Sequence, residues 1–132
     1  MFIEFNPNPT GRKVDDCSVR AISKALDTDW ESAYSRLCLD GFSMGNMPSA
    51  NEVIAAQLRK SGFYRKNIPN ECPNCYTIGD FADDNPEGTF VLGTGYHVAT
   101  IVNGDLYDTW DSSDLVPVYV WYKDVDPIFK EV

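Results

Sequence analysis

The sequence predicts an α+β fold in which N-terminal helices pack on a C-terminal antiparallel sheet, within a single domain over residues 1–132. Through residues 15–62, apolar residues recur at spacings of three and four, the period of an amphipathic helix. From residue 88 onward, runs rich in β-branched and aromatic residues are typical of strands. The length and the 43% hydrophobic content are those of one globular domain with a core.

The chain begins with an extended segment and a turn-rich loop. Residues 2–5 favour a short strand, and the asparagines, prolines and glycine of residues 6–11 favour a loop. The first core helix is expected to start at Asp15 or Asp16, because a carboxylate at a helix start accepts hydrogen bonds from unpaired backbone amides. Its apolar stripe consists of Val19, Ile22 and Leu26.

A second helix is expected directly after the first. Asp29 or Thr28 is expected to cap it, and its apolar stripe begins at Trp30. Gly41 is expected to end it, as glycine often does. Cys38 lies on the apolar stripe, which indicates a small buried hydrophobic residue.

Two further helices are predicted from the residues at which they begin. Ser49 and Glu52 have the spacing of a capping box for a third helix, which Gly62 ends. Thr77 is expected to cap a short fourth helix, after an irregular segment over residues 67–76.

The predicted sheet contains a β-hairpin between two further strands. Residues 88–93 and 116–122 have the composition of strands. Between them, Asn103-Gly104 predicts a two-residue turn, because both central positions of such a turn need positive φ. A turn of this length sets the register of the strands that it joins.

The only histidine of the chain, His97, lies in this hairpin. The register makes Asp108 a diagonal neighbour of His97 on the same face, within reach of its side chain. Asp111 is the alternate carboxylate and falls on the other face unless a bulge intervenes. A carboxylate beside a histidine holds the imidazole in one tautomer and raises its basicity, which suggests a nucleophile elsewhere in the chain.

Cys17 is the candidate nucleophile. It is expected in the first turn of the first helix, where backbone N–H groups and the helix dipole lower the pKa of a thiol. Arg20, one turn further on, is expected to add to this effect. The order Cys17, His97, Asp108 is the chain order of a Cys–His–Asp site, in which a thiolate attacks and the histidine protonates the leaving group.

The segments around these residues, 16–22, 95–101 and 107–111, resemble the papain-like cysteine peptidase superfamily, in the small single-domain form of C39-like and NlpC/P60-like bacterial and phage proteins. The resemblance implies a papain-like fold, with Cys17 as nucleophile, His97 as general base and acid, and Asp108 or alternatively Asp111 as the orienting group. It implies a peptide or protein substrate and a thiol hydrolase or transferase that cleaves an amide, isopeptide or thioester bond.

One position departs from this superfamily. Its members usually carry a glutamine about six residues before the cysteine, as an oxyanion-hole donor, and this chain has Gly11 there. The remaining candidates for that donor are the amides of Asn6 and Asn8 and the backbone N–H of Cys17. The departure leaves a second hypothesis open, a papain-like binding module such as a phage accessory protein that engages a host protein.

The two other cysteines, Cys72 and Cys75, have the spacing of a zinc knuckle. They are weak zinc candidates, because a four-ligand site needs two more ligands. A disulfide is the weaker interpretation in a chain without a secretion signal. We therefore expect a loop with two thiols, and no cofactor.

The formal net charge of −9 argues against nucleic acid as a partner, since phosphate contacts need clustered Lys and Arg. No apolar run approaches the roughly 20 residues that span a bilayer, which argues against a membrane partner. Residues 1–7 lack the pattern of a signal peptide. We expect a cytoplasmic protein, in the host cytoplasm if a phage encodes it.

Overall fold

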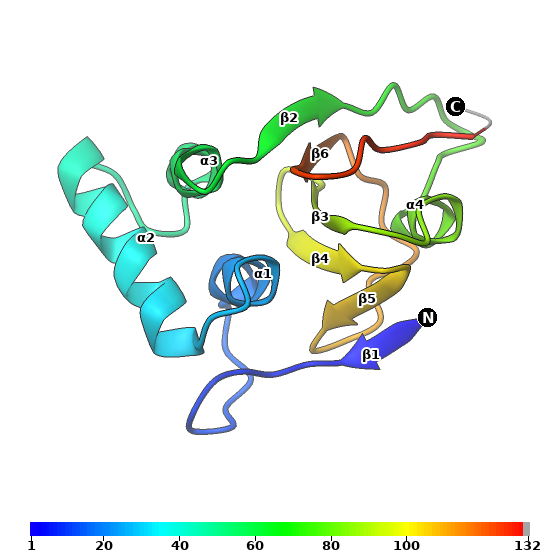
Figure 1. Ribbon diagram of the computed structural model, residues 1–132. Coiled ribbons are helices and arrows are strands. Elements are labelled where there is room, and N and C mark those ends of the chain that lie inside the picture. The colour runs from blue at the N-terminus through cyan, green and yellow to red at the C-terminus, as the bar shows by residue number, and fades with distance from the viewer. Residues whose placement is uncertain (131–132) are drawn as a thin grey trace.

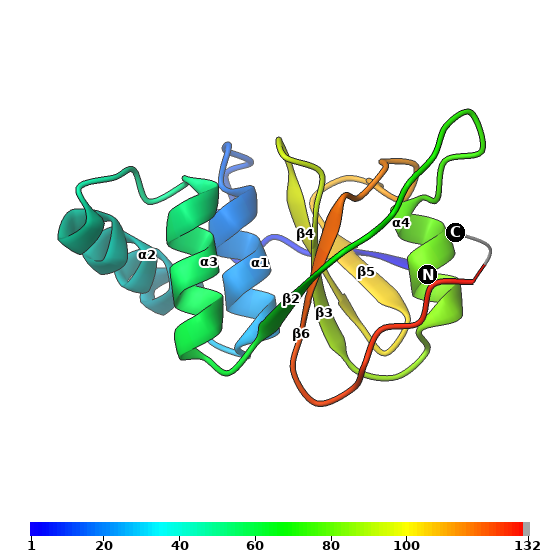
Figure 2. The same cartoon turned by 90° about the horizontal axis from the view of Figure 1, so that it is seen from above.

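The computed structural model describes residues 1–130, and these form an α+β arrangement of four helices around a six-stranded sheet. Three helices lie together on one side of the sheet and the fourth lies on the other (Figures 1 and 2). The helices are α1 (Cys17–Ala25), α2 (Trp30–Met44), α3 (Asn51–Lys60) and α4 (Ile78–Asp84). The sheet is therefore the middle of three layers.

The sheet is mixed, whereas the sequence predicted an antiparallel one. In spatial order its strands are β1 (Phe2–Glu4), β5 (Asp105–Asp108), β4 (Val98–Val102), β3 (Thr89–Gly93), β6 (Tyr119–Tyr122) and β2 (Tyr64–Asn67). Every neighbouring pair is antiparallel except β1 and β5, which run parallel. The four central strands match the predicted C-terminal sheet. The short strand predicted over residues 2–5 is present as β1, but the sequence did not place β1 or β2 at the edges of this sheet, because both lie far from the C-terminal strands along the chain.

Each face of the sheet carries its own hydrophobic core. On β3, Val91 packs with the cluster of α1, α2 and α3, whereas Phe90 and Leu92 pack with α4. The same alternation holds on β4, where Val98 belongs to the first cluster and Ala99 to the second. As a result α1 lies directly against β4.

Two of the local predictions are confirmed in detail. Asn103 and Gly104 have φ angles of 51° and 81°, as the predicted hairpin turn requires, and the strands beside them have the predicted register. Thr77 caps α4 with a capping box, in which its hydroxyl accepts from the backbone of Asp80 and its N–H donates to the Asp80 carboxylate.

The predicted end of the second helix is wrong. α2 continues through Gly41 and ends before Gly45, which has a φ of 66°. Gly41 instead allows the backbone of Asn46 to lie close to α2, because a Cβ at position 41 would lie 2.7 Å from the carbonyl oxygen of Asn46. Cys38, on the stripe of this helix, is half-buried rather than fully buried.

The predicted start of the third helix is also wrong. Ala50 is the N-cap residue of α3, and no side chain caps it. The Ser49–Glu52 capping box therefore does not form, because the helix begins at Asn51, two residues after the expected cap. Ser49 instead lines a cavity that is described below.

Gly93, the last residue of β3, is expected to be intolerant of any side chain. A Cβ at this position would overlap the ring of the buried Tyr119 on the neighbouring strand β6. We expect Gly93→Ala to lower the free energy of unfolding by about 1–3 kcal/mol, the usual cost of overpacking, as measured by urea denaturation. Gly79→Ala in α4 is the control, since its Cβ would have no neighbour closer than 3.3 Å. Equal losses in the two variants would contradict the overlap.

Candidate active site

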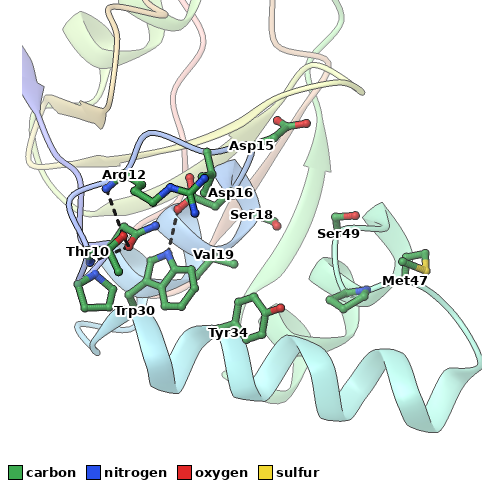
Figure 3. Close-up of a pocket in the computed structure, with 14 residues that line it drawn as sticks. Thr10, Arg12, Asp15, Asp16, Ser18, Val19, Trp30, Tyr34, Met47 and Ser49 are labelled. Carbon is green, nitrogen blue, oxygen red and sulfur yellow. Dashed lines mark hydrogen bonds between the residues drawn. The ribbon is translucent and has the colours of Figure 1, made fainter.

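Cys17 is the first residue of α1 and is half-buried. Asp16 occupies the predicted N-cap position, but its side chain makes no cap hydrogen bond. One carboxylate oxygen pairs with Arg20. The other accepts from Nε1 of Trp30 at 2.9 Å, a bond that Figure 3 shows. The Asp16 carboxylate therefore accepts no hydrogen bond from the backbone amides in the first turn of α1, which include the N–H of Cys17.

His97 lies directly before β4 and faces both partners that the sequence predicted for it. Its Nε2 lies 2.6 Å from Oδ2 of Asp108. Asp108 does not occupy the other ring nitrogen, Nδ1, and the Cys17 thiol is close enough to the imidazole for each group to shift the pKa of the other. The ring of Trp110 lies 5.2 Å from the imidazole ring, between centroids, and covers it in part.

The protonation states of Cys17 and His97 are coupled. Burial raises the pKa of the Cys17 thiol, but hydrogen bonds with His97 and with the backbone of Val98, together with the positive charges nearby, outweigh burial and hold that pKa below its ordinary value. Burial lowers the pKa of His97, but hydrogen bonds with Asp108 and Cys17 outweigh it and raise that pKa to about 9. Both shifts favour a thiolate–imidazolium pair.

Asp108 is buried, with 1% of its side chain exposed, and both of its carboxylate oxygens are held. Oδ1 accepts from Nη2 of Arg20 at 3.0 Å and from the backbone N–H of Thr109 at 2.8 Å. Oδ2 accepts from the hydroxyl of Ser112 at 2.7 Å and faces His97. Burial raises the pKa of Asp108, but the bonds with His97 and Ser112 outweigh it and lower that pKa. The carboxylate is therefore charged and held in one orientation.

Arg20 joins the two buried carboxylates of the site. Its guanidinium pairs with Asp16 through Nη1 and with Asp108 through Nη2, and all three side chains are less than 7% exposed. The sequence placed Arg20 near Cys17, but it missed the bond of Arg20 with Asp108. The sequence also missed the bonds that Ser112 donates to Asp108 and that Trp30 donates to Asp16. The only signal for these two bonds is that each side chain carries a hydrogen-bond donor.

A cavity of about 330 Å³ opens beside Cys17 and His97. Neither Asn6 nor Asn8 lines it, and Nδ2 of Asn6 donates instead to backbone carbonyls of its own loop, at 3.2 and 3.3 Å. Of the three predicted oxyanion-hole donors, only the backbone N–H of Cys17 belongs to a residue of this cavity. A side-chain amide that the sequence did not single out, that of Asn51 at the start of α3, also lines it.

Asp111, the alternate carboxylate, is not at the site. Its carboxylate accepts from the backbone N–H of Ser113 at 3.1 Å, and the side chain of Ser113 together with this backbone bond lowers the pKa of Asp111. The structure therefore brings together Cys17, His97 and Asp108, and it leaves Asp111 outside.

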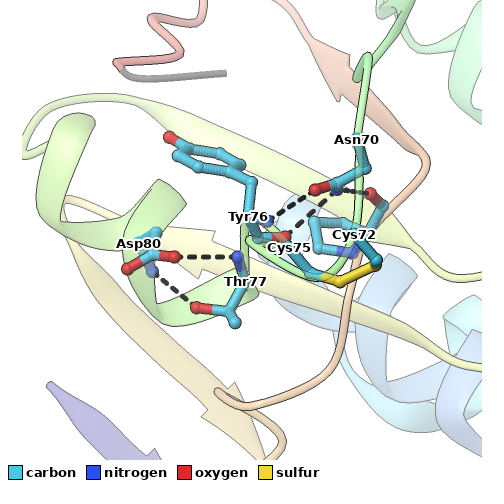
Figure 4. The surroundings of a disulfide bond; sticks show 7 residues. Asn70, Cys72, Cys75, Tyr76, Thr77 and Asp80 are labelled. Atoms are coloured by element: carbon cyan, nitrogen blue, oxygen red, sulfur yellow. Dashed lines mark hydrogen bonds between the residues drawn. A yellow bond between two sulfur atoms is a disulfide. The ribbon is translucent and has the colours of Figure 1, made fainter.

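Cys72 and Cys75 form a disulfide, with Cα atoms 4.5 Å apart (Figure 4). The expected loop with two thiols is therefore wrong, since two cysteines three residues apart can close a disulfide within one turn of the chain. Asn70 holds this loop by accepting from the N–H of Tyr76 at 2.5 Å and donating to the carbonyl of Tyr76 at 3.1 Å. Residues 1–130 hold no group of three side chains arranged to bind a metal ion.

Comparisons with protein-family models, curated proteins and solved structures find no match to this chain. No helix within residues 1–130 is long and apolar enough to cross a membrane.

Proposed function

We propose that this protein is a thiol hydrolase or transferase of papain-like fold, which cleaves an amide, isopeptide or thioester bond in a peptide or protein. The observations that carry the proposal are the contact of His97 with Asp108 and the place of Cys17 and His97 side by side in the lining of one cavity. The order of elements supports the fold, because Cys17 starts a helix that lies against β4, which directly follows His97, and against β5, which ends at Asp108.

The proposed reaction starts from the thiolate of Cys17. The sulfur attacks the carbonyl carbon of the substrate, an S–C bond forms, and the carbonyl oxygen becomes an oxyanion beside the N–H of Cys17. The imidazolium of His97 gives its proton to the leaving amine or thiolate as the bond to the acyl carbon breaks. Water or an amine then attacks the thioester, His97 takes its proton, and Cys17 leaves as the thiolate.

Asp108 contributes by orientation and charge. It receives the Nε2–H of His97, so the proton to be transferred is held on the other ring nitrogen, Nδ1. The negative charge of Asp108 also stabilises the imidazolium in a place where little water is present.

Alkylation by iodoacetamide tests the proposed ion pair without knowledge of the substrate. We expect Cys17 at pH 6 to react at least about ten times faster than Cys38, because only thiolates react and the pKa of Cys17 is lowered. His97→Ala is expected to remove most of this advantage. Mass spectrometry measures the rate at each cysteine, and Cys38 is the internal control, as a free thiol on α2.

The proposal is wrong if Cys17 reacts no faster than Cys38 at pH 6, or if His97→Ala leaves its rate unchanged. A pull-down then tests the second candidate function, in which the protein is a papain-like module that binds a host protein. The glycine at position 11, in place of an oxyanion-hole glutamine, favours this second candidate. A module of this kind captures its partner equally well with Cys17→Ala.

A further inference from the structure

One edge of the sheet, strand β2, is exposed along its whole length. All four of its side chains are exposed, and β6 is the only strand that pairs with it within residues 1–130. Figure 2 looks onto this edge, and no other helix or strand of the described chain lies in front of β2. The outer side of β2 is therefore open to another chain, as unpaired edges of sheets are.

The backbone of β2 has two residues that face outward, Arg65 and Asn67. The N–H of Ile68, the next residue, donates to the carbonyl of Val118 at 3.0 Å, so Ile68 faces the side of β6. In an antiparallel pair, residues that bond with the partner strand alternate with residues that face away from it. Lys66 therefore also faces β6, whereas Arg65 and Asn67 face away. Within residues 1–130 their two N–H and two C=O groups remain for an added strand.

The side chains along this edge are basic, although the formal net charge of the chain is −9. Arg65 and Lys66 belong to β2 itself. Arg59 lies in the last turn of α3, just before β2, and Lys123 directly follows β6. Within residues 1–130 none of these four side chains pairs with a carboxylate. Neither β2 nor β6 contains an aspartate or a glutamate, so the edge has positive charges without acidic partners.

The two charges of β2 lie on opposite faces of the sheet. The guanidinium of Arg65 lies over the ring of Tyr119, 4.6 Å from its centroid, and Tyr119 packs with the core of α1, α2 and α3. The ammonium of Lys66 lies over the ring of Phe129, at 5.5 Å, and Phe129 packs with the core of α4. An aromatic ring thus holds each charge beside the edge. An added strand with two adjacent acidic residues would meet one cation on each face.

A second copy of this chain does not fit the edge. Pairing of β2 with the β2 of another copy would bring Arg65 and Lys66 close to the same two residues of that copy. Like charges that face each other across two strands destabilise the pairing, and basic residues on edge strands commonly prevent such self-association. The same two charges favour a strand of opposite charge.

We propose that β2 binds an extended, acidic segment of another protein, which joins the sheet as an additional strand. Backbone bonds with Arg65 and Asn67 hold the segment, and the side chains of Arg65 and Lys66 select acidic residues. The inference goes beyond the proposed function and does not depend on the reaction of Cys17, because no residue of β2 lines the cavity beside Cys17.

A fluorescent peptide with two adjacent glutamates among valines and threonines tests this inference. Fluorescence anisotropy is expected to show saturable binding with a Kd below about 1 mM. The same peptide with two lysines in place of the glutamates is expected to bind at least about tenfold more weakly. Arg65→Glu together with Lys66→Glu is expected to reverse this preference, because both exposed charges of β2 then change sign.

Arg12→Glu together with Lys13→Glu is the matched control. It changes the net charge by the same amount, and both residues are exposed in the loop before α1. This variant is expected to keep the preference for the glutamate peptide, since the change lies outside β2.

Amide hydrogen exchange, measured by nuclear magnetic resonance, separates strand addition from attraction between charges alone. With the glutamate peptide, the N–H groups of Arg65 and Asn67 are expected to exchange at least about tenfold more slowly, whereas that of Lys66 changes little because β6 already holds it. Three results would overturn the inference: no binding of the glutamate peptide, binding without slower exchange at Arg65 and Asn67, or an unchanged preference in the β2 variant. Loss of the Cys17 reactivity would remove the proposed function and leave this inference in place.

Discussion

Arg20→Met is expected to lower the free energy of unfolding by about 3–5 kcal/mol, the usual cost of removing one partner from a buried ion pair. The guanidinium of Arg20 lies between Asp16 and Asp108, which are 6% and 1% exposed. Without it, two carboxylates remain in a place where little water can solvate them. Urea denaturation followed by tryptophan fluorescence measures the loss.

Two further variants serve as controls for the stability of Arg20→Met. Arg36→Met removes an exposed arginine on α2 and is expected to change the stability by less than about 0.5 kcal/mol. Arg20→Lys keeps the charge but replaces a two-pronged donor with one ammonium, so we expect an intermediate loss. If Arg20→Met and Arg36→Met unfold at the same urea concentration, the ion pairs of Arg20 with Asp16 and Asp108 add nothing to stability.

Asp108→Asn is expected to lower the pKa of His97 from about 9, because the hydrogen bond and charge of Asp108 are among the causes that raise it. An amide nitrogen in place of Oδ2 would donate to Nε2 and leave the imidazole neutral. The thiolate of Cys17 then loses its positive partner. For the proposed reaction we expect the rate of peptide cleavage to fall by about 10³–10⁴-fold, as in triads that lose their carboxylate.

Nuclear magnetic resonance measures this change directly, because the chain has one histidine. The imidazole resonances of the native protein are expected to titrate near pH 9, and those of Asp108→Asn at a lower pH. Asp111→Asn is the control, since Asp111 bonds only to its own turn. An unchanged titration in Asp108→Asn would exclude Asp108 as the group that sets the charge of His97.

The candidate site was predictable where local rules apply. The Asn103-Gly104 turn allowed only one register, and that register brought Asp108 beside His97. Cys17 follows two acidic residues at the start of an apolar stripe, so its place at the start of a helix was also local information.

The remaining parts depend on contacts between distant segments. Strict alternation puts Asp108 on the face of Leu106, away from α1, yet Asp108 contacts Arg20 of α1 because β5 ends at this residue. The parallel pairing of β1 with β5 has no local signal, since three residues of strand pair equally well with many partners. Gly41 was misread for the same reason, because its close neighbour is a carbonyl outside the helix.

The order of the elements along the chain affects when Cys17 acquires the neighbours that the proposed reaction needs. Arg20 and Asp108 are 88 residues apart, and the ribosome makes α1 long before it makes β4 and β5. Until those strands emerge and pair, Cys17 has neither its histidine nor the carboxylate behind it. An unfinished nascent chain therefore carries Cys17 without these neighbours, and the proposed nucleophile is assembled only when synthesis of the sheet is nearly complete.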